Sequence, residues 1–280
     1  MTEIMESLIV AVAPNGARRT KADHPRLPLT AGEIAAEAVA CRDAGAAMLH
    51  LHVRDAEGRH SLDPGAYREA IAAVRAAVGD DLIIQVTSEA AGRYAAPEQM
   101  AMVRAIRPEA VSLAIRELVP EAAHERTAAA FFAEIVEGGT VPQYILYDAS
   151  DVRRFADLRA RGVVPGARPF VLFVLGRYAT GRAAHPRDLV PFLAAWADDG
   201  PWALCAFGAA EHACVTAAAA LGGHVRVGFE NNLALADGSR APDNAALVSQ
   251  IAETAGLLGR PLADAATARA MLADPVAAGP

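Results

Sequence analysis

The sequence predicts an α/β fold of the (β/α)8 TIM-barrel type, in which residues 1–280 form a single domain ending in a short helix. Eight short apolar segments alternate with eight helix-like segments, and the connections between them are short. The apolar segments are continuously hydrophobic, as expected for parallel strands buried on both faces. A doubly wound sheet is the alternative, but no Gly-x-Gly-x-x-Gly follows the first strand.

Local signals define the elements in order. The first strand, residues 7–13, is closed by Pro14-Asn15-Gly16, and Thr30 with Glu33 forms a capping box for a helix that stops at Gly45. The second strand carries His50 and His52. The later strands are predicted at residues 82–86, 110–113, 141–147, 170–175, 202–206 and 225–229, and the later helices at 63–78, 97–107, 122–137, 150–161, 186–197, 212–221, 243–258 and 265–272.

Composition excludes several classes of protein. The net charge is −7 and no basic block occurs, which argues against nucleic-acid binding. No apolar run approaches the length of about 18 residues that a membrane span needs. The three cysteines are scattered, so no disulfide framework is implied, and the acidic N-terminus lacks the basic start of a secretion signal. We therefore expect a soluble, cytoplasmic protein.

The pair His50 and His52 is the first candidate for chemistry. Alternate residues of a β-strand share one face, so the two imidazoles should point in the same direction. Two imidazoles in this arrangement can hold a divalent metal, usually zinc. The alternative is a pair of histidines that are hydrogen-bonded in the core or at the strand end.

The last strand carries charged residues whose side chains should point toward the same space as the two histidines. Arg226 and Glu230 share one parity with Gly228, and in a barrel the second and eighth strands both flank the first. Glu230 should therefore approach the two histidines and complete a zinc site with an open fourth position. The alternative is an Arg226–Glu230 salt bridge that serves only to stabilise the barrel, since a buried charge needs a partner.

Other polar residues follow the third and fourth strands. Thr87 and Ser88 come after the third strand, Ser112 ends the fourth, and Arg116 lies just beyond it. These side chains are candidates for binding a substrate carboxylate. Arg18, after the first strand, adds a second arginine, and arginine binds carboxylates with two hydrogen bonds. Arg18 and Arg116 together predict a polar or anionic far end of the substrate; the alternative is that both arginines face solvent or contact phosphate groups.

Several stretches carry a resemblance to a known family. They are AGA at residues 44–46 leading into HLHVR at 50–54, IIQVT at 83–87 and GGHVRVGFE at 222–230. The chain resembles the β-keto acid cleavage enzymes over nearly its whole length. The resemblance implies a barrel with zinc on His50, His52 and Glu230, hydroxyls of Thr87 and Ser112 on the substrate carboxylate, and Arg226 in proton removal. It also implies a homotetramer.

The implied reaction joins a β-keto acid to acetyl-CoA and yields acetoacetate and a new acyl-CoA. Zinc acts as a Lewis acid on the keto oxygen, which makes the carbon between the carbonyls acidic. The enolate attacks the acetyl thioester, and the released CoA thiolate then attacks the keto carbon, so that a carbon–carbon bond breaks in a retro-Claisen step.

The chain departs from the family pattern at three places. Asn231 replaces an aspartate that would pair with Arg226, Ser88-Glu89-Ala90 replaces Thr-Gly-Gly, and Ala-Ile-Arg-Glu at residues 114–117, after Ser112 and Leu113, stands in place of a small turn. Because arginine holds its proton tightly, Arg226 fits stabilisation of an enolate better than the role of a base. These changes reshape the pocket, so the resemblance does not identify the β-keto acid that this chain prefers.

Two other functions remain open at this point. A zinc hydrolase of the amidohydrolase type also uses His-x-His, but it needs further histidines after the fifth and sixth strands, where Tyr147-Asp148 and Gly176-Arg177 stand. A paralogue that binds acyl-CoA or a keto acid without turnover is the non-enzymatic alternative, motivated by Asn231.

Overall fold

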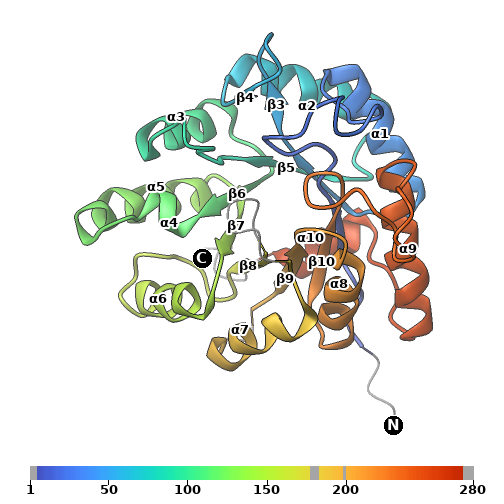
Figure 1. Ribbon diagram of the computed structural model, residues 1–280. Helices are drawn as coiled ribbons and strands as arrows, with labels where there is room; N and C mark the ends of the chain where they lie inside the picture. The colour runs from blue at the N-terminus through green and yellow to red at the C-terminus, as the bar shows by residue number, and fades with distance from the viewer. Residues whose placement is uncertain (1–4, 177–182, 198–199, 274–280) are drawn as a thin grey trace.

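The computed structural model describes residues 5–176, 183–197 and 200–273. Eight parallel strands close into a barrel in the order β1-β10-β9-β8-β7-β6-β5-β2, which confirms the predicted fold (Figure 1). The barrel strands are β1 Val10–Val12, β2 Met48–Leu51, β5 Ile83–Thr87, β6 Ala110–Ala114, β7 Val141–Leu146, β8 Phe170–Leu175, β9 Trp202–Ala206 and β10 His224–Val227.

Helices surround the barrel, as Figure 1 shows in a view along its axis. The α-helices are α1 Ala31–Asp43, α2 Pro64–Val78, α3 Ala96–Ile106, α4 Ile115–Leu118, α5 Glu125–Glu137, α6 Ala149–Ala160, α7 Val190–Ala195, α8 Glu211–Ala220, α9 Asn244–Leu257 and α10 Ala265–Leu272, and the 3-10 helices are η1 Ala122–His124 and η2 Pro186–Leu189. The capping signals act as expected: Thr30 and Glu33 form the capping box of α1, and Asp63 caps α2 ahead of Pro64.

The structure differs from the prediction at a few elements. An antiparallel hairpin of β3 Val53–Arg54 and β4 His60–Ser61 follows β2, and strands of this length are too short to produce a sequence period. The helix predicted at 186–197 divides into η2 and α7, where Pro191 cannot donate a backbone hydrogen bond. The loop expected after β8 falls partly on residues 177–182, outside the described residues.

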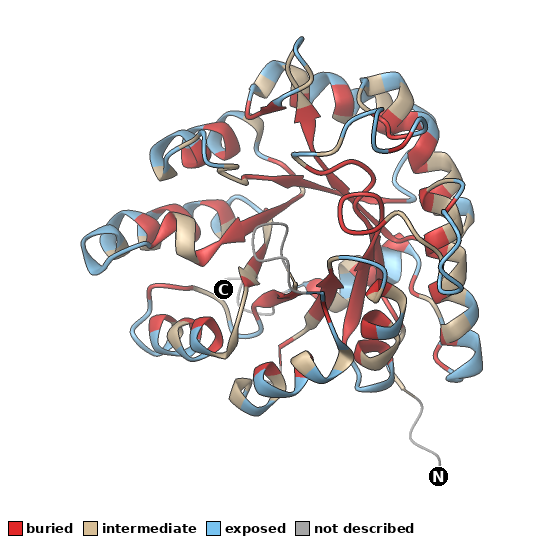
Figure 2. Ribbon diagram, in the orientation of Figure 1, coloured by how far each residue is buried: buried red, intermediate tan, exposed pale blue. Residues whose placement is uncertain are grey.

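Strand parity separates two kinds of buried side chain. Alternate strand residues face the helices and form the larger apolar core, and the others face the barrel axis. Figure 2 shows that the barrel strands are mostly buried. The axial set is apolar at the amino ends of the strands, where Ile9, Met48 and Ile83 pack together. Two residues further along their strands the axial side chains are polar, since His50 follows Met48 and Gln85 follows Ile83 on the same face. Apart from His224 at the start of β10, the polar groups of the barrel interior named here therefore lie toward the carboxyl ends of the strands.

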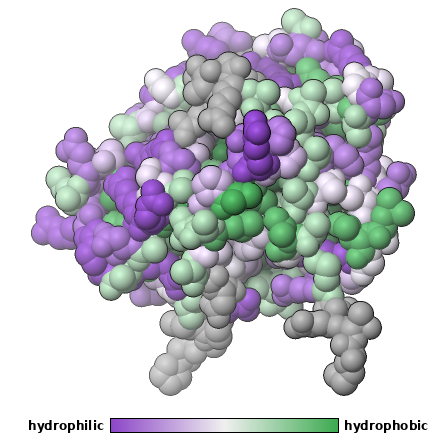
Figure 3. All heavy atoms as spheres, turned by 60° about the horizontal axis from the view of Figure 1, so that its bottom comes forward, coloured by the Kyte–Doolittle hydropathy of each residue, from purple (hydrophilic) through white to green (hydrophobic). Residues whose placement is uncertain are grey.

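The outer surface is largely polar with small apolar groups. Figure 3 shows one such face, where apolar side chains gather near the centre among hydrophilic ones. Large apolar side chains exposed on the described residues include Val190, Leu221, Leu257 and Leu258. None of the described helices is both long enough and apolar enough to cross a membrane.

Candidate metal centre at the carboxyl end of the barrel

Three buried side chains converge at the carboxyl end of the barrel. His50 belongs to β2, His52 lies just beyond it, and Glu230 lies in the turn after β10. Glu230 Oε2 is 3.5 Å from His50 Nε2 and 3.2 Å from His52 Nε2, and the two Nε2 atoms are 3.1 Å apart. One ligand atom from each residue therefore lies within 4.8 Å of the other two. The structure brings together the three residues that the sequence singled out.

A glutamine fixes the orientation of His50. Gln85 Oε1 lies 2.7 Å from His50 Nδ1, and Gln85 Nε2 donates to Gln143 Oε1 at 3.1 Å. With a proton on Nδ1, the His50 ring presents the Nε2 lone pair to Glu230 and His52, as in metal sites where an outer acceptor holds the ligating imidazole. Burial, followed by the charge of Arg226, holds the pKa of His50 well below its ordinary value, so the ring is neutral.

The turn that carries Glu230 is held by its backbone. Glu230 N donates to Ala13 O at 3.0 Å and Phe229 N donates to Asn244 Oδ1 at 2.7 Å. Glycine is required on both sides of the contact between this turn and the segment that follows β1. A Cβ at Gly228, where φ is +136°, would lie 2.4 Å from Ala13 O, and a Cβ at Gly16, where φ is +61°, would lie 2.6 Å from Glu230 Cγ.

Arg226 lies beside the cluster, buried in the barrel. Its guanidinium donates to Glu230 Oε1 at 3.0 Å and approaches Cys205 Sγ at 3.4 Å. Burial alone would raise the pKa of Glu230, but Arg226 and the two histidines outweigh it and hold the pKa below its ordinary value. The salt bridge and the metal site are thus not alternatives, because one oxygen of Glu230 faces Arg226 and the other faces the imidazoles.

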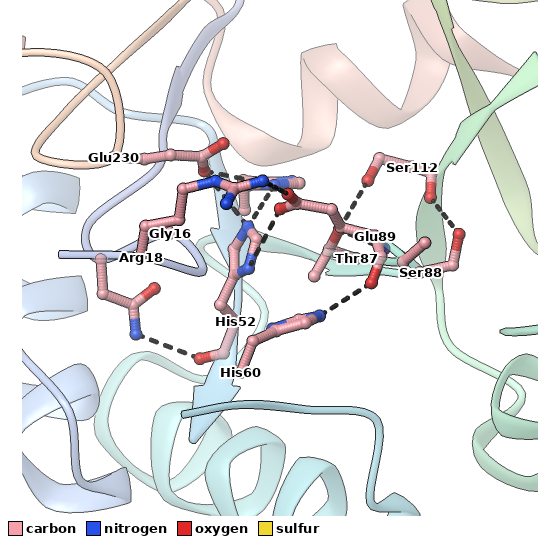
Figure 4. A network of polar contacts seen from close by, with 12 residues as sticks. Gly16, Arg18, His52, His60, Thr87, Ser88, Glu89, Ser112 and Glu230 are labelled. Atoms are coloured by element: carbon pink, nitrogen blue, oxygen red, sulfur yellow. Dashed lines mark hydrogen bonds and ion pairs between the residues drawn. The ribbon is translucent and has the colours of Figure 1, made fainter. Parts of the chain in front are cut away.

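The hydroxyl residues lie across the barrel from this carboxylate (Figure 4). Ser112 Oγ donates to Thr87 Oγ1 at 3.3 Å, which also accepts from Glu89 N at 3.1 Å. Ser88 Oγ instead donates to the carbonyl of Ser112 at 3.0 Å. Thr87 and Ser112 are therefore adjacent, as a shared carboxylate subsite needs, whereas the hydroxyl of Ser88 bonds to the main chain of the next strand.

The two arginines expected near the substrate have different surroundings. Arg116 donates to Asp151 Oδ1 at 2.7 Å and also to Asp148, so its charge is already matched by two carboxylates. Arg18 is half exposed, and its guanidinium lies 3.9 Å from Glu89 Oε1. Of the two, Arg18 is the one that lies beside Glu89.

Sequence reasoning gave no role in the site to Gln85 or Glu89. Gln85 is the one polar residue within a run of apolar ones, and it shares parity with Thr87, so strand geometry alone could have placed it inside the barrel. Glu89 Oε2 lies 4.0 Å from His52 Nδ1, a contact that depends on the path of a loop. Asn231 is fully buried, and its side-chain amide makes no hydrogen bond within the described residues.

This donor set fits zinc. Two neutral imidazole nitrogens and one carboxylate oxygen are a common protein ligand set for catalytic zinc, which keeps a further position open. The ligands are buried, and Gln85 supplies the outer hydrogen bond that such histidines need. Fold and site together define a TIM-barrel enzyme whose candidate metal centre lies at the carboxyl face of the strands, where such barrels place their active sites.

Residues 7–273 match the family model described as beta-keto acid cleavage enzyme, and the chain belongs to this family. It is 30% identical over 275 residues to 3-keto-5-aminohexanoate cleavage enzyme of Acetoanaerobium sticklandii, covering 96% of this chain and 98% of that one. It is also 30% identical to 3-oxoadipate:acetyl-CoA acetyltransferase of Cupriavidus necator, with 95% of each chain covered.

A solved structure gives the same fold at lower sequence identity. The structure titled apo ObcA superposes with a TM-score of 0.69 at 17% identity, covering 89% of this chain and 65% of that one. At this identity the likeness concerns the barrel alone. It agrees with the closed order of eight parallel strands.

Proposed function

We propose that this protein is a zinc-dependent enzyme that condenses a β-keto acid with acetyl-CoA and releases acetoacetate and a new acyl-CoA. The observation that carries the proposal is the convergence of His50, His52 and Glu230, whose ligand atoms lie within 4.8 Å of one another beside the buried Arg226. The names of the curated relatives, which include an acetyl-CoA acetyltransferase of a β-keto acid, support the same reaction class.

His50, His52 and Glu230 would hold the zinc ion, and the bound ion supplies a Lewis acid that makes the carbon between the two carbonyls acidic. Arg226 directs a guanidinium toward the same space from its salt bridge with Glu230. This positive charge stabilises negative charge as it develops on the substrate oxygen, and the buried position strengthens the effect. Because an arginine holds its proton, we assign Arg226 this electrostatic role and no role as a base.

Thr87 and Ser112 are proposed to bind the substrate carboxylate. Their hydroxyls are 3.3 Å apart on neighbouring strands and lie inside the barrel. Two hydroxyl donors fixed in this way orient the acid so that its keto group reaches the metal centre, which lowers the entropic part of the barrier. Ser88 would contribute by holding the main chain of Ser112 through its hydrogen bond at 3.0 Å.

The far end of the acid is proposed to be polar. The relatives named above act on acids that differ at this end, one with an amino group and one with a second carboxylate, according to their names. In this chain Arg116 is engaged by Asp148 and Asp151, so Arg18 is the arginine that remains to meet a substrate group. We also propose a homotetramer in the cytoplasm, with size-exclusion chromatography as the check on the assembly.

The test is to incubate the zinc-loaded protein with acetyl-CoA and a panel of β-keto acids, and to measure acetoacetate and acyl-CoA. The panel includes 3-oxoadipate and 3-keto-5-aminohexanoate, with the variant His50→Ala as the metal-site control. Formation of both products with an acid of the panel, lost in His50→Ala, supports the proposal. Tight binding of acyl-CoA without any product would instead identify a binding protein, the alternative that Asn231 motivates.

A further inference from the structure

The two histidines of the metal centre differ in their outer hydrogen bonds. His50 Nδ1 meets Gln85 Oε1 at 2.7 Å, whereas His52 Nδ1 is buried and makes no hydrogen bond within the described residues. A ligating imidazole needs an acceptor on its second nitrogen to fix its tautomer and its ring orientation. The carboxylate nearest to that nitrogen in the structure is Glu89, whose Oε2 lies 4.0 Å away.

The main chain of Glu89 is fixed from three directions. Its N–H donates to Thr87 Oγ1 at 3.1 Å, its carbonyl lies 2.9 Å from His60 Nε2, and the next N–H, of Ala90, donates to Glu117 Oε2 at 2.9 Å. These partners belong to β5, to the hairpin strand β4 and to α4. Such a set of contacts places the Glu89 side chain on the His52 side of the loop, as Figure 4 shows.

The other oxygen of Glu89 faces a positive charge. Arg18 lies 3.9 Å from Oε1, so the carboxylate stands between an arginine and an imidazole. His60 makes no hydrogen bond to His52: its Nε2 bonds to the Glu89 carbonyl, its Nδ1 has no hydrogen-bond partner within the described residues, and its ring packs 5.3 Å from the His52 ring, centroid to centroid. The Glu89 side chain keeps 28% of its surface exposed, so it is not packed on every side.

We propose that Glu89 is a positioning residue of the metal centre. Its carboxylate accepts the Nδ1–H of His52 and so directs the Nε2 lone pair of His52 toward the cation, while Arg18 holds the second oxygen. This inference rests on the zinc site of the proposed function. It assigns Arg18 a part in supporting the metal centre in addition to its proposed contact with substrate, and it gives His52 the support that Gln85 gives His50.

The test compares zinc dissociation constants, measured by competition with a chelator, for wild type, Glu89→Ala and Glu89→Gln. Loss of an outer acceptor weakens metal binding by about 10- to 100-fold, and we expect this of Glu89→Ala. Glu89→Gln keeps an acceptor oxygen, so its zinc dissociation constant should stay within about 3-fold of the wild-type value. Glu121→Gln, which removes a carboxylate at an exposed position, is the matched control and should bind zinc as wild type does.

Two results would overturn the proposal. Wild-type affinity in a folded Glu89→Ala protein means that His52 needs no such partner. Equal weakening in the alanine and glutamine variants means that Glu89 acts by charge and not through the hydrogen bond. If the wild-type protein binds no zinc, the proposed function fails. The contact is then decided on the metal-free protein by the ¹⁵N chemical shift of His52 Nδ1, which should change in Glu89→Ala and stay near the wild-type value in Glu89→Gln.

Discussion

Gln85 Oε1 lies 2.7 Å from His50 Nδ1, so a residue of β5 orients an imidazole of the candidate metal centre on the neighbouring strand β2. The two residues are also paired in register, with their Cα atoms opposite each other. Their contact is thus set by the barrel itself and not by a loop, which makes His50 the most rigidly oriented of the three candidate ligands.

Gln85→Leu should weaken zinc binding by about 10- to 100-fold, because Leu has a similar volume but offers no acceptor to His50 Nδ1. Gln143→Leu removes only the hydrogen bond of 3.1 Å that Gln85 Nε2 donates to Gln143 Oε1, so it should also weaken zinc binding, but by less. Zinc affinity by chelator competition measures both. An unchanged affinity in Gln85→Leu would show that the His50 tautomer is fixed in another way.

Arg226→Met should retain the fold and bound zinc but lose activity by about 100-fold or more, since removal of one donor from an oxyanion site costs about 3 kcal/mol of transition-state stabilisation. The variant removes the arginine that lies 3.0 Å from the buried carboxylate of Glu230, and removal of one partner of a buried ion pair is costly. The metal-free variant should therefore lose more stability than the zinc-loaded one. Urea unfolding with and without zinc checks this, and an equal loss in both states would indicate a purely structural arginine.

Gly16→Ala should reduce zinc affinity because its Cβ would lie 2.6 Å from Glu230 Cγ and would displace that side chain. Gly58 offers a matched control, since it also has a positive φ, +76° against +61°, but nothing lies within 4 Å of an added Cβ. Both alanine variants should lose about 1 to 2 kcal/mol of stability from the left-handed backbone. Only Gly16→Ala should lose zinc affinity, and equal affinities in the two variants would contradict the packing role of Gly16.

His224 should make the protein sensitive to acid. Ile9 N donates to His224 Nδ1 at 3.2 Å, and burial, reinforced by Arg260, lowers the pKa of His224 to about 3. At pH values between about 6.5, the ordinary pKa of histidine, and about 3, this imidazole is protonated in the unfolded chain but not in the folded protein. The free energy of unfolding therefore falls as the pH falls, by up to about 1.4 kcal/mol per pH unit.

Comparison of urea unfolding at pH 7 and pH 5 tests this for wild type and His224→Gln. The variant should lose up to about 2 kcal/mol less than wild type on acidification. His124→Gln, at an exposed position, serves as the control and should follow wild type. Parallel losses in wild type and His224→Gln would contradict the assignment.

The candidate ligands could be predicted from the sequence because each depends on a regular period. His50 lies in β2 and His52 continues its alternation just beyond the strand end, and closure of the barrel brings Glu230 to the same end. The partners of Arg116 could not be predicted, since Asp148 and Asp151 come from the next βα unit and the pairing depends on side-chain conformation. The contact of Glu89 with His52 depends on a loop held by Glu117 and His60, for which no periodic signal exists.

The first strand of the barrel separates the sources of the three candidate ligands, because β1 pairs with β2 on one side and with β10 on the other. When only the first half of the chain has left the ribosome, both histidines are present but the carboxylate ligand is not. The complete donor set arises only after the last strand has been synthesised and has docked beside the first. At the proposed zinc site, tight uptake therefore requires a completely synthesised chain, and a protein cut between β5 and β10 should capture the ion only when its two fragments reassociate.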